Sequence, residues 1–167
     1  MEIALISDTH IPSRESQIPE PFEERIRNAD HVIHAGDFDS EGTLSNIREM
    51  AAHLTAVAGN MDANFGLPQV ATLKIGGVEF VITHGTGSPR GYEARLARAV
   101  EEHAETENAV AIGGHTHRLL DTDYEGTRLL NPGSVTGASP ADHPTMLTLT
   151  VEDGTLDVDI HEYWGEW

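Results

Sequence analysis

The sequence predicts an α/β fold in which two mixed β-sheets pack face to face as a sandwich flanked by α-helices. Three observations predict it: apolar runs alternate with helix-like segments in the first third of the chain, glycine-containing turns separate paired apolar runs in the remainder, and short polar motifs directly follow the strands. A length of 167 residues is typical of one domain with a sizeable core. We therefore expect a single domain spanning residues 1–167.

The first third of the chain has the order strand–helix–strand–helix–strand. Apolar runs typical of strands buried on both faces cover residues 3–6, 31–35 and 54–58, and helical spacing covers residues 20–28 and 40–50. Ser40 offers a side-chain oxygen that can cap the start of the second helix. This alternation predicts parallel strands joined by right-handed crossovers.

Hairpins dominate the chain after residue 68. The paired runs are 70–75 with 78–82, 119–123 with 127–130, and 146–151 with 155–160, separated by Gly76-Gly77, Glu125-Gly126 and Asp153-Gly154. Turns that contain glycine favour tight hairpins because glycine readily adopts positive φ. Residues 91–107 have an apolar stripe at helical spacing, and residues 109–112 form one more short strand. A parallel first part and a hairpin-rich second part predict two sheets.

The chain is strongly acidic. It has 28 acidic and 10 basic residues, a formal net charge of −18, and Lys74 as its single lysine. One interpretation is an ordinary acidic cytosolic protein. However, the use of arginine in place of lysine and the many small residues give a composition that resembles proteins of haloarchaea. At molar salt the Debye length is only about 3 Å, so the charge does not exclude a polyanionic substrate. A polybasic patch of the kind that binds nucleic acid is absent from the sequence.

The absence of cysteine restricts the chemistry of any metal site. Without cysteine, ligands must be imidazole, carboxylate or amide oxygen, which suit Mn, Fe, Zn or Mg. No apolar run reaches the roughly 18 residues that span a bilayer, and the apolar N-terminus is too short for a signal peptide. We expect a cytoplasmic enzyme with no membrane partner.

Five short polar motifs each come directly after a predicted strand. They are Asp8-Thr9-His10, Gly36-Asp37, Gly59-Asn60-Met61-Asp62, His84-Gly85 and Gly113-Gly114-His115-Thr116-His117. Loops at the carboxyl ends of parallel strands converge on one crevice, so we expect these side chains to meet. Residues two positions apart in extended backbone point to the same side, which predicts that Asp8 and His10 hold one ion together. His115 and His117 form a second such pair.

The motifs supply two carboxylates, four imidazoles and one amide oxygen. These candidate metal ligands are Asp8, His10, Asp37, Asn60, His84, His115 and His117. The set is too large for one ion and suits two, with water and substrate filling the remaining positions. A shared carboxylate would hold the ions about 3.5–4 Å apart, a spacing that suits in-line displacement at phosphorus.

The ordered set resembles the calcineurin-like metallophosphoesterase superfamily, with its D-x-H, GD, GN-x-D, H and G-H-x-H blocks. The small prokaryotic phosphodiesterases of the YfcE type are the most similar subgroup. The resemblance extends from Ile3 to about Ile160 and includes the turn Asn131-Pro132-Gly133-Ser134. It implies the metallophosphoesterase fold, a β-sandwich flanked by helices.

Carried over by position, the resemblance implies which residues hold each of two divalent metal ions. Asp8, His10 and His117 would hold the first, Asn60, His84 and His115 the second, and Asp37 would bridge them. Mn²⁺ is the first assumption, although the ligand types also permit Fe, Zn, Ni or Co. Asp37, Asn60 and His84 are the candidate catalytic residues of a phosphodiesterase whose metal-activated hydroxide attacks phosphorus in a small phosphoester substrate.

The proton donor for the leaving group is unassigned. Many relatives carry histidine at the position of Met61, and methionine cannot donate a proton. Two other functions stay open: a phosphomonoesterase that uses the same metals, and a protein-interaction scaffold like the small subunit of the retromer complex. That scaffold typically lacks a histidine of the D-x-H or H-x-H set, whereas all seven positions are competent ligands here, which favours catalysis.

Several polar residues beside the motifs are candidates for support. Asp39, Asp62 and His34 could orient ligands or nearby backbone, Asn131 could stabilise the loop beneath the site, and Arg14 and Arg90 could grip phosphate oxygens. For His34, packing in the core is the alternative, and for the arginines, a solvated surface. Trp164 and Trp167 are candidate contacts of a homo-oligomer.

Overall fold

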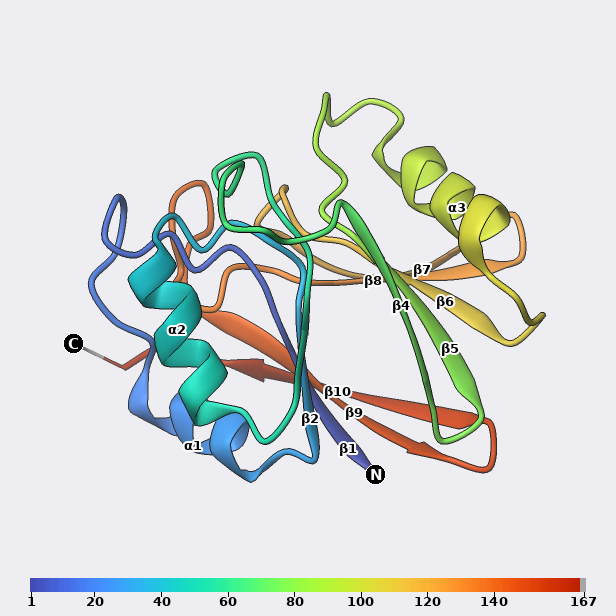
Figure 1. Ribbon diagram of the computed structural model, residues 1–167, viewed down its shortest axis with the longest axis horizontal. Coiled ribbons are helices and arrows are strands. Elements are labelled where there is room, and N and C mark those ends of the chain that lie inside the picture. Colours follow the sequence, from blue (N-terminus) through green and yellow to red (C-terminus); the bar gives the residue numbers. More distant parts are fainter. Residues whose placement is uncertain (166–167) are drawn as a thin grey trace.

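The computed structural model describes residues 1–165 and has two five-stranded mixed sheets, which confirms the predicted fold class (Figure 1). The first sheet has the order β10-β9-β1-β2-β3. Its strands are β1 (Glu2–Ile6), β2 (His31–His34), β3 (Leu54–Ala56), β9 (Thr145–Glu152) and β10 (Thr155–Glu162). The second sheet has the order β4-β5-β6-β8-β7. Its strands are β4 (Val70–Ile75), β5 (Val78–Thr83), β6 (Ala109–Ile112), β7 (Leu119–Tyr124) and β8 (Thr127–Pro132).

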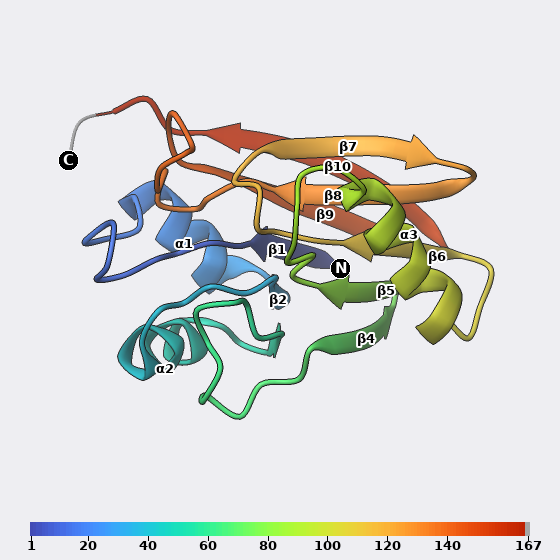
Figure 2. The same ribbon diagram turned by 90° about the horizontal axis from the view of Figure 1, so that it is seen from above.

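The helices cover the outer faces of both sheets. α1 (Glu20–Asn28) and α2 (Glu41–Met50) lie against the first sheet, and α3 (Tyr92–His103) lies against the second (Figures 1 and 2). The Ser40 side chain accepts a hydrogen bond from the Thr43 amide at 3.1 Å, so the predicted cap of α2 is confirmed. None of the helices in the described residues is long and apolar enough to cross a membrane.

The alternation of side chains along the strands creates separate core layers. Ile3 and Leu5 point between the two sheets, where they join Phe80 and other buried apolar residues. Ala4 and Ile6, the intervening residues of β1, belong to the layer between the first sheet and α1 and α2. Because successive side chains of a strand face opposite sides, an apolar run such as residues 3–6 can fill both layers at once.

Parallel pairing brings the predicted site to one end of the sandwich. β1, β2 and β3 are parallel neighbours in the first sheet, and β5, β6 and β8 are parallel neighbours in the second. The loops that follow these strands gather at the upper edge of Figure 1. The carboxyl ends of parallel strands therefore place polar loops from both sheets around one locus.

α3 is shorter than the predicted helix over residues 91–107. Gly91 precedes it in the left-handed conformation with φ of 80°, and Ala104 ends it with extended backbone angles. After that residue, the buried carboxylate of Glu79 accepts hydrogen bonds from the amides of Glu105 and Thr106, at 3.0 and 2.8 Å. An acceptor on the neighbouring sheet thus competes for amides that a longer helix would use, which the local apolar pattern could not reveal.

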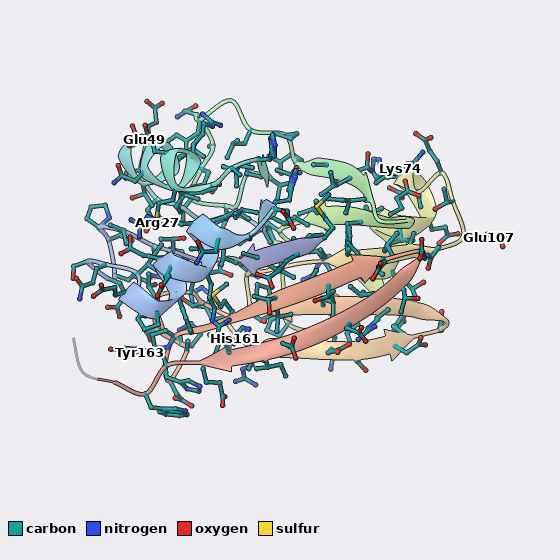
Figure 3. The ribbon with its side chains drawn as sticks, turned by 90° about the horizontal axis from the view of Figure 1, so that it is seen from below. Arg27, Glu49, Lys74, Glu107, His161 and Tyr163 are labelled. Carbon is teal, nitrogen blue, oxygen red and sulfur yellow. The ribbon has the colours of Figure 1, made fainter. Side chains whose placement is uncertain are left out.

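The outer face of β9 and β10 is visible in Figure 3, where Tyr163 lies beside α1 and Lys74 and Glu107 lie at the opposite end. Trp164, beyond β10, is 70 % exposed and its ring stacks on His143 with centroids 3.6 Å apart. Trp167 lies outside the described residues. A role of either tryptophan in a subunit contact stays a prediction.

Replacing Glu79 with glutamine should destabilise the fold. Glutamine has the shape of glutamate but lacks the charge that strengthens three hydrogen bonds, including one from the Thr106 hydroxyl at 2.9 Å. We therefore expect the free energy of unfolding to fall by about 1–2 kcal/mol at pH 7. Burial raises the pKa of Glu79, but these hydrogen bonds outweigh burial, so the pKa is lowered. The stabilisation is therefore complete above the ordinary carboxyl pKa and disappears as pH falls through the lowered folded-state value.

Denaturant unfolding of wild type and Glu79→Gln at several pH values measures this difference, with Glu102→Gln on the exposed face of α3 as the matched control. Equal stability of the Glu79 variant and wild type at pH 7 would contradict the role given to this carboxylate.

Candidate metal centre

Two clusters of potential metal ligands face each other where the strand-end loops meet. The first contains Asp8, His10 and His117, and the second contains Asp37, His84 and His115. Within each cluster, one candidate ligand atom of every residue lies within 4.8 Å of those of the others. Six of the seven predicted ligands are therefore brought together in two groups of three, and Asn60 lies beside the second group.

The first cluster is compact and buried. Asp8 Oδ1 lies 3.3 Å from His117 Nε2 and 3.6 Å from His10 Nε2, and the two imidazole nitrogens are 3.1 Å apart. The three residues are between 0 and 5 % exposed. One carboxylate oxygen and two ring nitrogens thus converge on a single point in a region shielded from water.

The second cluster has the same organisation with one more exposed side. His84 Nε2 lies 3.1 Å from Asp37 Oδ2, and His115 Nδ1 lies 3.3 Å from Asn60 Oδ1. His84 is buried, whereas Asn60 is exposed. The Asn60 side of this cluster is therefore the side open to solvent.

Asp37 lies between the clusters. Its Oδ2 atom is 3.4 Å from His10 Nε2 in the first cluster and 3.1 Å from His84 Nε2 in the second. Its other oxygen, Oδ1, accepts a hydrogen bond from the Met61 amide at 2.9 Å. A carboxylate oxygen within reach of both groups is the arrangement that a bridging ligand requires.

The ring nitrogens that face away from the clusters have oxygen partners. His10 Nδ1 lies 2.9 Å from Asp39 Oδ1, and the Nδ1 atoms of His84 and His117 lie 2.7 and 2.8 Å from backbone carbonyls of Ala35 and Ala138. Since carboxylate and carbonyl oxygens only accept, each Nδ1 carries the proton and leaves Nε2 as the atom presented to the centre. His115 is reversed, because its Nε2 donates to the Gly87 carbonyl at 3.1 Å and its Nδ1 faces Asn60.

The electrostatics of the centre call for positive charge. The pKa of Asp8 is held well below its usual range: burial raises it, but the imidazoles of His10 and His117, 3.6 and 3.3 Å from its Oδ1 atom, outweigh that effect. Burial lowers the pKa of His84, but the nearby carboxylates of Asp37, 3.1 Å from Nε2, and Asp8 raise it to about 9. Both carboxylates therefore stay ionised, and the histidines carry the compensating protons when no cation is bound.

The donor set fits a pair of divalent cations. Four buried side-chain atoms of the described residues have no hydrogen-bond partner: Arg95 Nε and His143 Nδ1 lie elsewhere, whereas Asp8 Oδ1 and His84 Nε2 belong to the clusters. Buried polar atoms without partners are costly, so such atoms in a native fold call for a ligand. Carboxylate and imidazole donors suit Mn²⁺, Fe²⁺ or Zn²⁺.

The backbone at these positions is strained. The non-glycine residues with positive φ in the described chain are Asp8, His10, Asp37, Asp39, His115, His117, Glu125 and Asp153. The last two occupy predicted hairpin turns, and the other six are five candidate ligands and one residue bonded to a ligand. Such conformations cost on the order of 1 kcal/mol or more each and gather at functional sites, where the surroundings impose them.

These angles correct the expectation that residues two apart act as pairs in extended backbone. Asp8 and His10 do share a cluster, but with φ of 54° and 47°, not in an extended strand. His115 and His117 fall in different clusters. The left-handed turns redirect the side chains, so the rule of alternating strand faces does not apply beyond the last strand residue.

Asp62 organises the loop that carries Asp37. Its carboxylate accepts hydrogen bonds from the amides of Asp37, Phe38, Asp39 and Gly59, at 2.7 to 3.1 Å for the shortest bond to each. One buried side chain thus fixes four amides of the two loops that present Asp37 and Asn60. The suggestion that Asp62 orients neighbouring backbone is confirmed.

His34 and Asn131 support the site from below. His34 Nδ1 accepts from the Gly36 amide at 3.0 Å and its Nε2 lies 2.8 Å from the Thr9 hydroxyl, while burial lowers its pKa to about 3 and keeps it neutral. Asn131 donates to the Gly114 carbonyl at 3.0 Å. Both residues therefore position ligand loops, and His34 also packs on Phe38, so the two alternatives for it were not exclusive.

Sequence patterns did not indicate several supporting contacts. Ser7 Oγ donates to Asp8 Oδ2 at 2.7 Å, and the Tyr92 hydroxyl donates to the Gly114 carbonyl at 2.6 Å. A Cβ at Gly59 would lie 2.1 Å from Asp37 Oδ1, so glycine is required beside the bridge. Of these contacts, only the last was indicated by the sequence, through the glycine that precedes Asn60. Arg14 instead donates to the Ser139 carbonyl, at 2.8 Å.

Comparison with known proteins gives consistent matches over nearly the whole chain. Residues 1–154 match the family described as "Calcineurin-like phosphoesterase superfamily domain". A "Probable metallophosphoesterase" of Methanothermobacter thermautotrophicus is 36% identical over 163 residues, which cover 96% of this chain and 91% of the relative.

Solved structures of Vps29 from Entamoeba histolytica are also similar. A single mutant has a TM-score of 0.79 at 27% identity, with 98% of this chain and 99% of that chain covered. The wild-type protein complexed with Zn²⁺ has a TM-score of 0.75 at 26% identity, with coverage of 97% and 99%.

Replacing Asp62 with asparagine should weaken metal binding without touching a ligand. The side-chain amide of asparagine would present an N–H group to backbone amides that are themselves donors. The loop carrying Asp37 would therefore lose hydrogen bonds that hold it in place. We expect about a 10- to 100-fold loss of Mn²⁺ affinity, the range typical of residues that orient ligands. Isothermal titration calorimetry measures it, with Asp142→Asn as the control and unchanged affinity of the Asp62 variant as the contradicting result.

Metal binding should release protons below about pH 9. His84 has its pKa raised to about 9, so at lower pH the cation must displace a proton from Nε2. Apparent affinity should therefore fall as pH drops, by about tenfold per unit for each proton released. Calorimetry at pH 7 in buffers of different ionisation enthalpy counts these protons, and an identical binding heat in every buffer would contradict the expected displacement.

Proposed function

The chain belongs to the calcineurin-like phosphoesterase superfamily, and from that premise we propose that it is a metal-dependent phosphodiesterase. The single observation that supports this most is the bridging position of Asp37 between two ligand clusters whose nitrogens are turned toward the centre. A site with one shared carboxylate and three-residue groups on each side suits two ions better than one.

The residues of the chain supply binding, orientation and charge. Asp8, His10 and His117 would hold one ion, Asn60, His84 and His115 the other, with Asp37 shared. When bound, two cations would supply an activated water nucleophile and would neutralise the charge that develops on the phosphoryl oxygens. Asp37, Asn60 and His84 are the catalytic residues in this proposal, because Asp37 and His84 lie 3.1 Å apart in the cluster whose Asn60 side is open to solvent.

Diester rather than monoester substrates suit the position of Met61. This side chain follows Asn60 directly, is 44 % exposed and cannot donate a proton to a leaving group. A poor proton donor favours substrates whose leaving group departs as a stable anion. An apolar side chain at the open edge also suits a second ester group better than the hydrated oxygens of a monoester dianion.

The metal and the working conditions are part of the proposal. Mn²⁺ is the first candidate, and the Zn²⁺ complex of the similar Vps29 supports zinc as a second. The charge of −18 supports a protein adapted to a salty cytoplasm, so molar KCl is the appropriate medium. Such salt also screens the repulsion between this surface and anionic substrates.

A protein-interaction scaffold is the alternative function. The similarity to Vps29 structures supports it, with a TM-score of 0.79 over 98% of this chain. The complete set of seven candidate ligands supports catalysis instead, because six of them converge in two groups of three and Asn60 lies beside the second. A phosphomonoesterase that uses the same metals is the nearer variant of the enzyme proposal.

Hydrolysis of bis(p-nitrophenyl) phosphate in molar KCl with Mn²⁺ tests the proposal. We expect activity that needs the metal and falls by at least about a thousandfold in Asp37→Asn and His84→Ala, the loss typical of removing a group that acts on the transition state. His103→Ala, an exposed histidine at the end of α3, is the matched control and should be fully active.

Two results would overturn the proposal. Absence of bound metal and of any Mn²⁺-stimulated hydrolysis would favour the scaffold. Faster hydrolysis of p-nitrophenyl phosphate than of the diester would favour the monoesterase.

A further inference from the structure

We propose that a groove beside the metal centre, lined by Tyr92, Leu120 and Tyr124, binds an aromatic ester group of the substrate, with Arg118 gripping its phosphoryl group. The proposal rests on the proposed phosphoesterase function and names the substrate class: phosphoesters that carry an aromatic ring, such as an aryl or nucleoside group. We call this site the Tyr92–Tyr124 groove.

The groove has the size and lining of a ligand site. Its volume is about 570 Å³, within the range of small-molecule pockets. α3 contributes Tyr92 and Ala94 to the lining, and β7 contributes Leu120 and Tyr124. Aromatic and aliphatic side chains on facing elements favour a flat ring, because ring stacking adds about 0.5–1.5 kcal/mol to the burial of apolar area.

The groove borders the loop that carries two of the candidate ligands. Thr116, which lies between the candidate ligands His115 and His117, lines it. The Tyr92 hydroxyl donates to the Gly114 carbonyl at 2.6 Å, and Asn131 Nδ2 lies 3.0 Å from both this hydroxyl and the Thr116 hydroxyl. The wall of the groove and the ligand loop are therefore one hydrogen-bonded unit, and a ring in the groove would lie beside the loop that carries His115 and His117.

Arg118 provides the matching positive charge. It directly follows His117, lines the groove, is exposed, and its guanidinium has no ion-pair partner within 4.0 Å in residues 1–165. In a chain with 28 acidic and 10 basic residues, an arginine left unpaired beside a ligand loop is suited to an anionic ligand. A guanidinium binds two phosphoryl oxygens at once, which a lysine cannot do.

Glu93 restricts the ligand further. It also lines the groove, and its carboxylate would repel a second phosphate there. It can accept hydrogen bonds from the hydroxyl or N–H groups of a nucleoside. The lining thus favours one phosphate at the metals and an uncharged ring in the groove over a polyphosphate chain.

Two phosphonates that cannot be hydrolysed separate the parts of the proposal. Phenylphosphonate and methylphosphonate share the anionic group and differ only in the ring. Calorimetric titration of each into the Mn²⁺-loaded protein in molar KCl should give at least about fivefold tighter binding of the phenyl compound, the fold-change that stacking of this strength produces.

Substitutions then assign the preference to the groove. Ala94→Trp fills the groove from α3 and should abolish the preference for the ring while methylphosphonate still binds. Arg118→Gln should weaken both phosphonates about tenfold. Glu101→Trp and Arg48→Gln, at exposed positions of α3 and α2 outside the groove, are the controls and should match wild type. Thermal unfolding checks that each variant is folded.

The outcomes distinguish this proposal from the proposed function. Equal affinity for the two phosphonates, no binding of either, or a preference that survives Ala94→Trp would overturn the groove even if the protein hydrolyses bis(p-nitrophenyl) phosphate. A ring preference that Ala94→Trp removes would support the groove even in a protein that hydrolyses no phosphodiester.

Discussion

Two buried carboxylates without a fixed cation determine the chemistry of this protein. Asp8 and Asp37 are at most 2 % exposed, and no arginine or lysine of the described residues forms an ion pair with either. Their charge must be balanced by protons on histidines or by bound cations, because isolated buried charge is very costly. Hydrogen bonds keep Nδ1 protonated on His10, His84 and His117 and direct the Nε2 atoms toward the centre. Cations can therefore replace protons on Nε2.

The candidate metal centre lies at one end of the sandwich because parallel strands of both sheets end there. Left-handed turns then redirect the side chains, so His115 and His117, which a continued strand would place on one face, belong to different clusters. Such turns persist only where the surroundings enforce them, and Asp62, with four amides bound, is the clearest example of that enforcement. The Tyr92–Tyr124 groove depends on the same framework, since Asn131 joins its wall to the ligand loop.

Local sequence patterns predicted every helix and strand of residues 1–165 and the end of the sandwich at which polar motifs meet. They could do so because apolar periodicity and glycine turns act over a few residues. The end of α3 depends on Glu79, a residue of another strand, and the separation of His115 from His117 depends on backbone angles that no periodicity encodes. The groove joins α3 to β7, so it exists only once the second sheet has formed. What local patterns could not supply is therefore contact between distant segments, although the family resemblance did assign His115 and His117 to different ions.

Electron paramagnetic resonance of the Mn²⁺-loaded protein tests the two-metal centre most directly. Two ions about 3.5–4 Å apart, with Asp37 between them, would be exchange-coupled. The account predicts binding of two equivalents of Mn²⁺ per chain and the multiline spectrum of a coupled pair. A spectrum of isolated Mn²⁺ that saturates at one equivalent would contradict it.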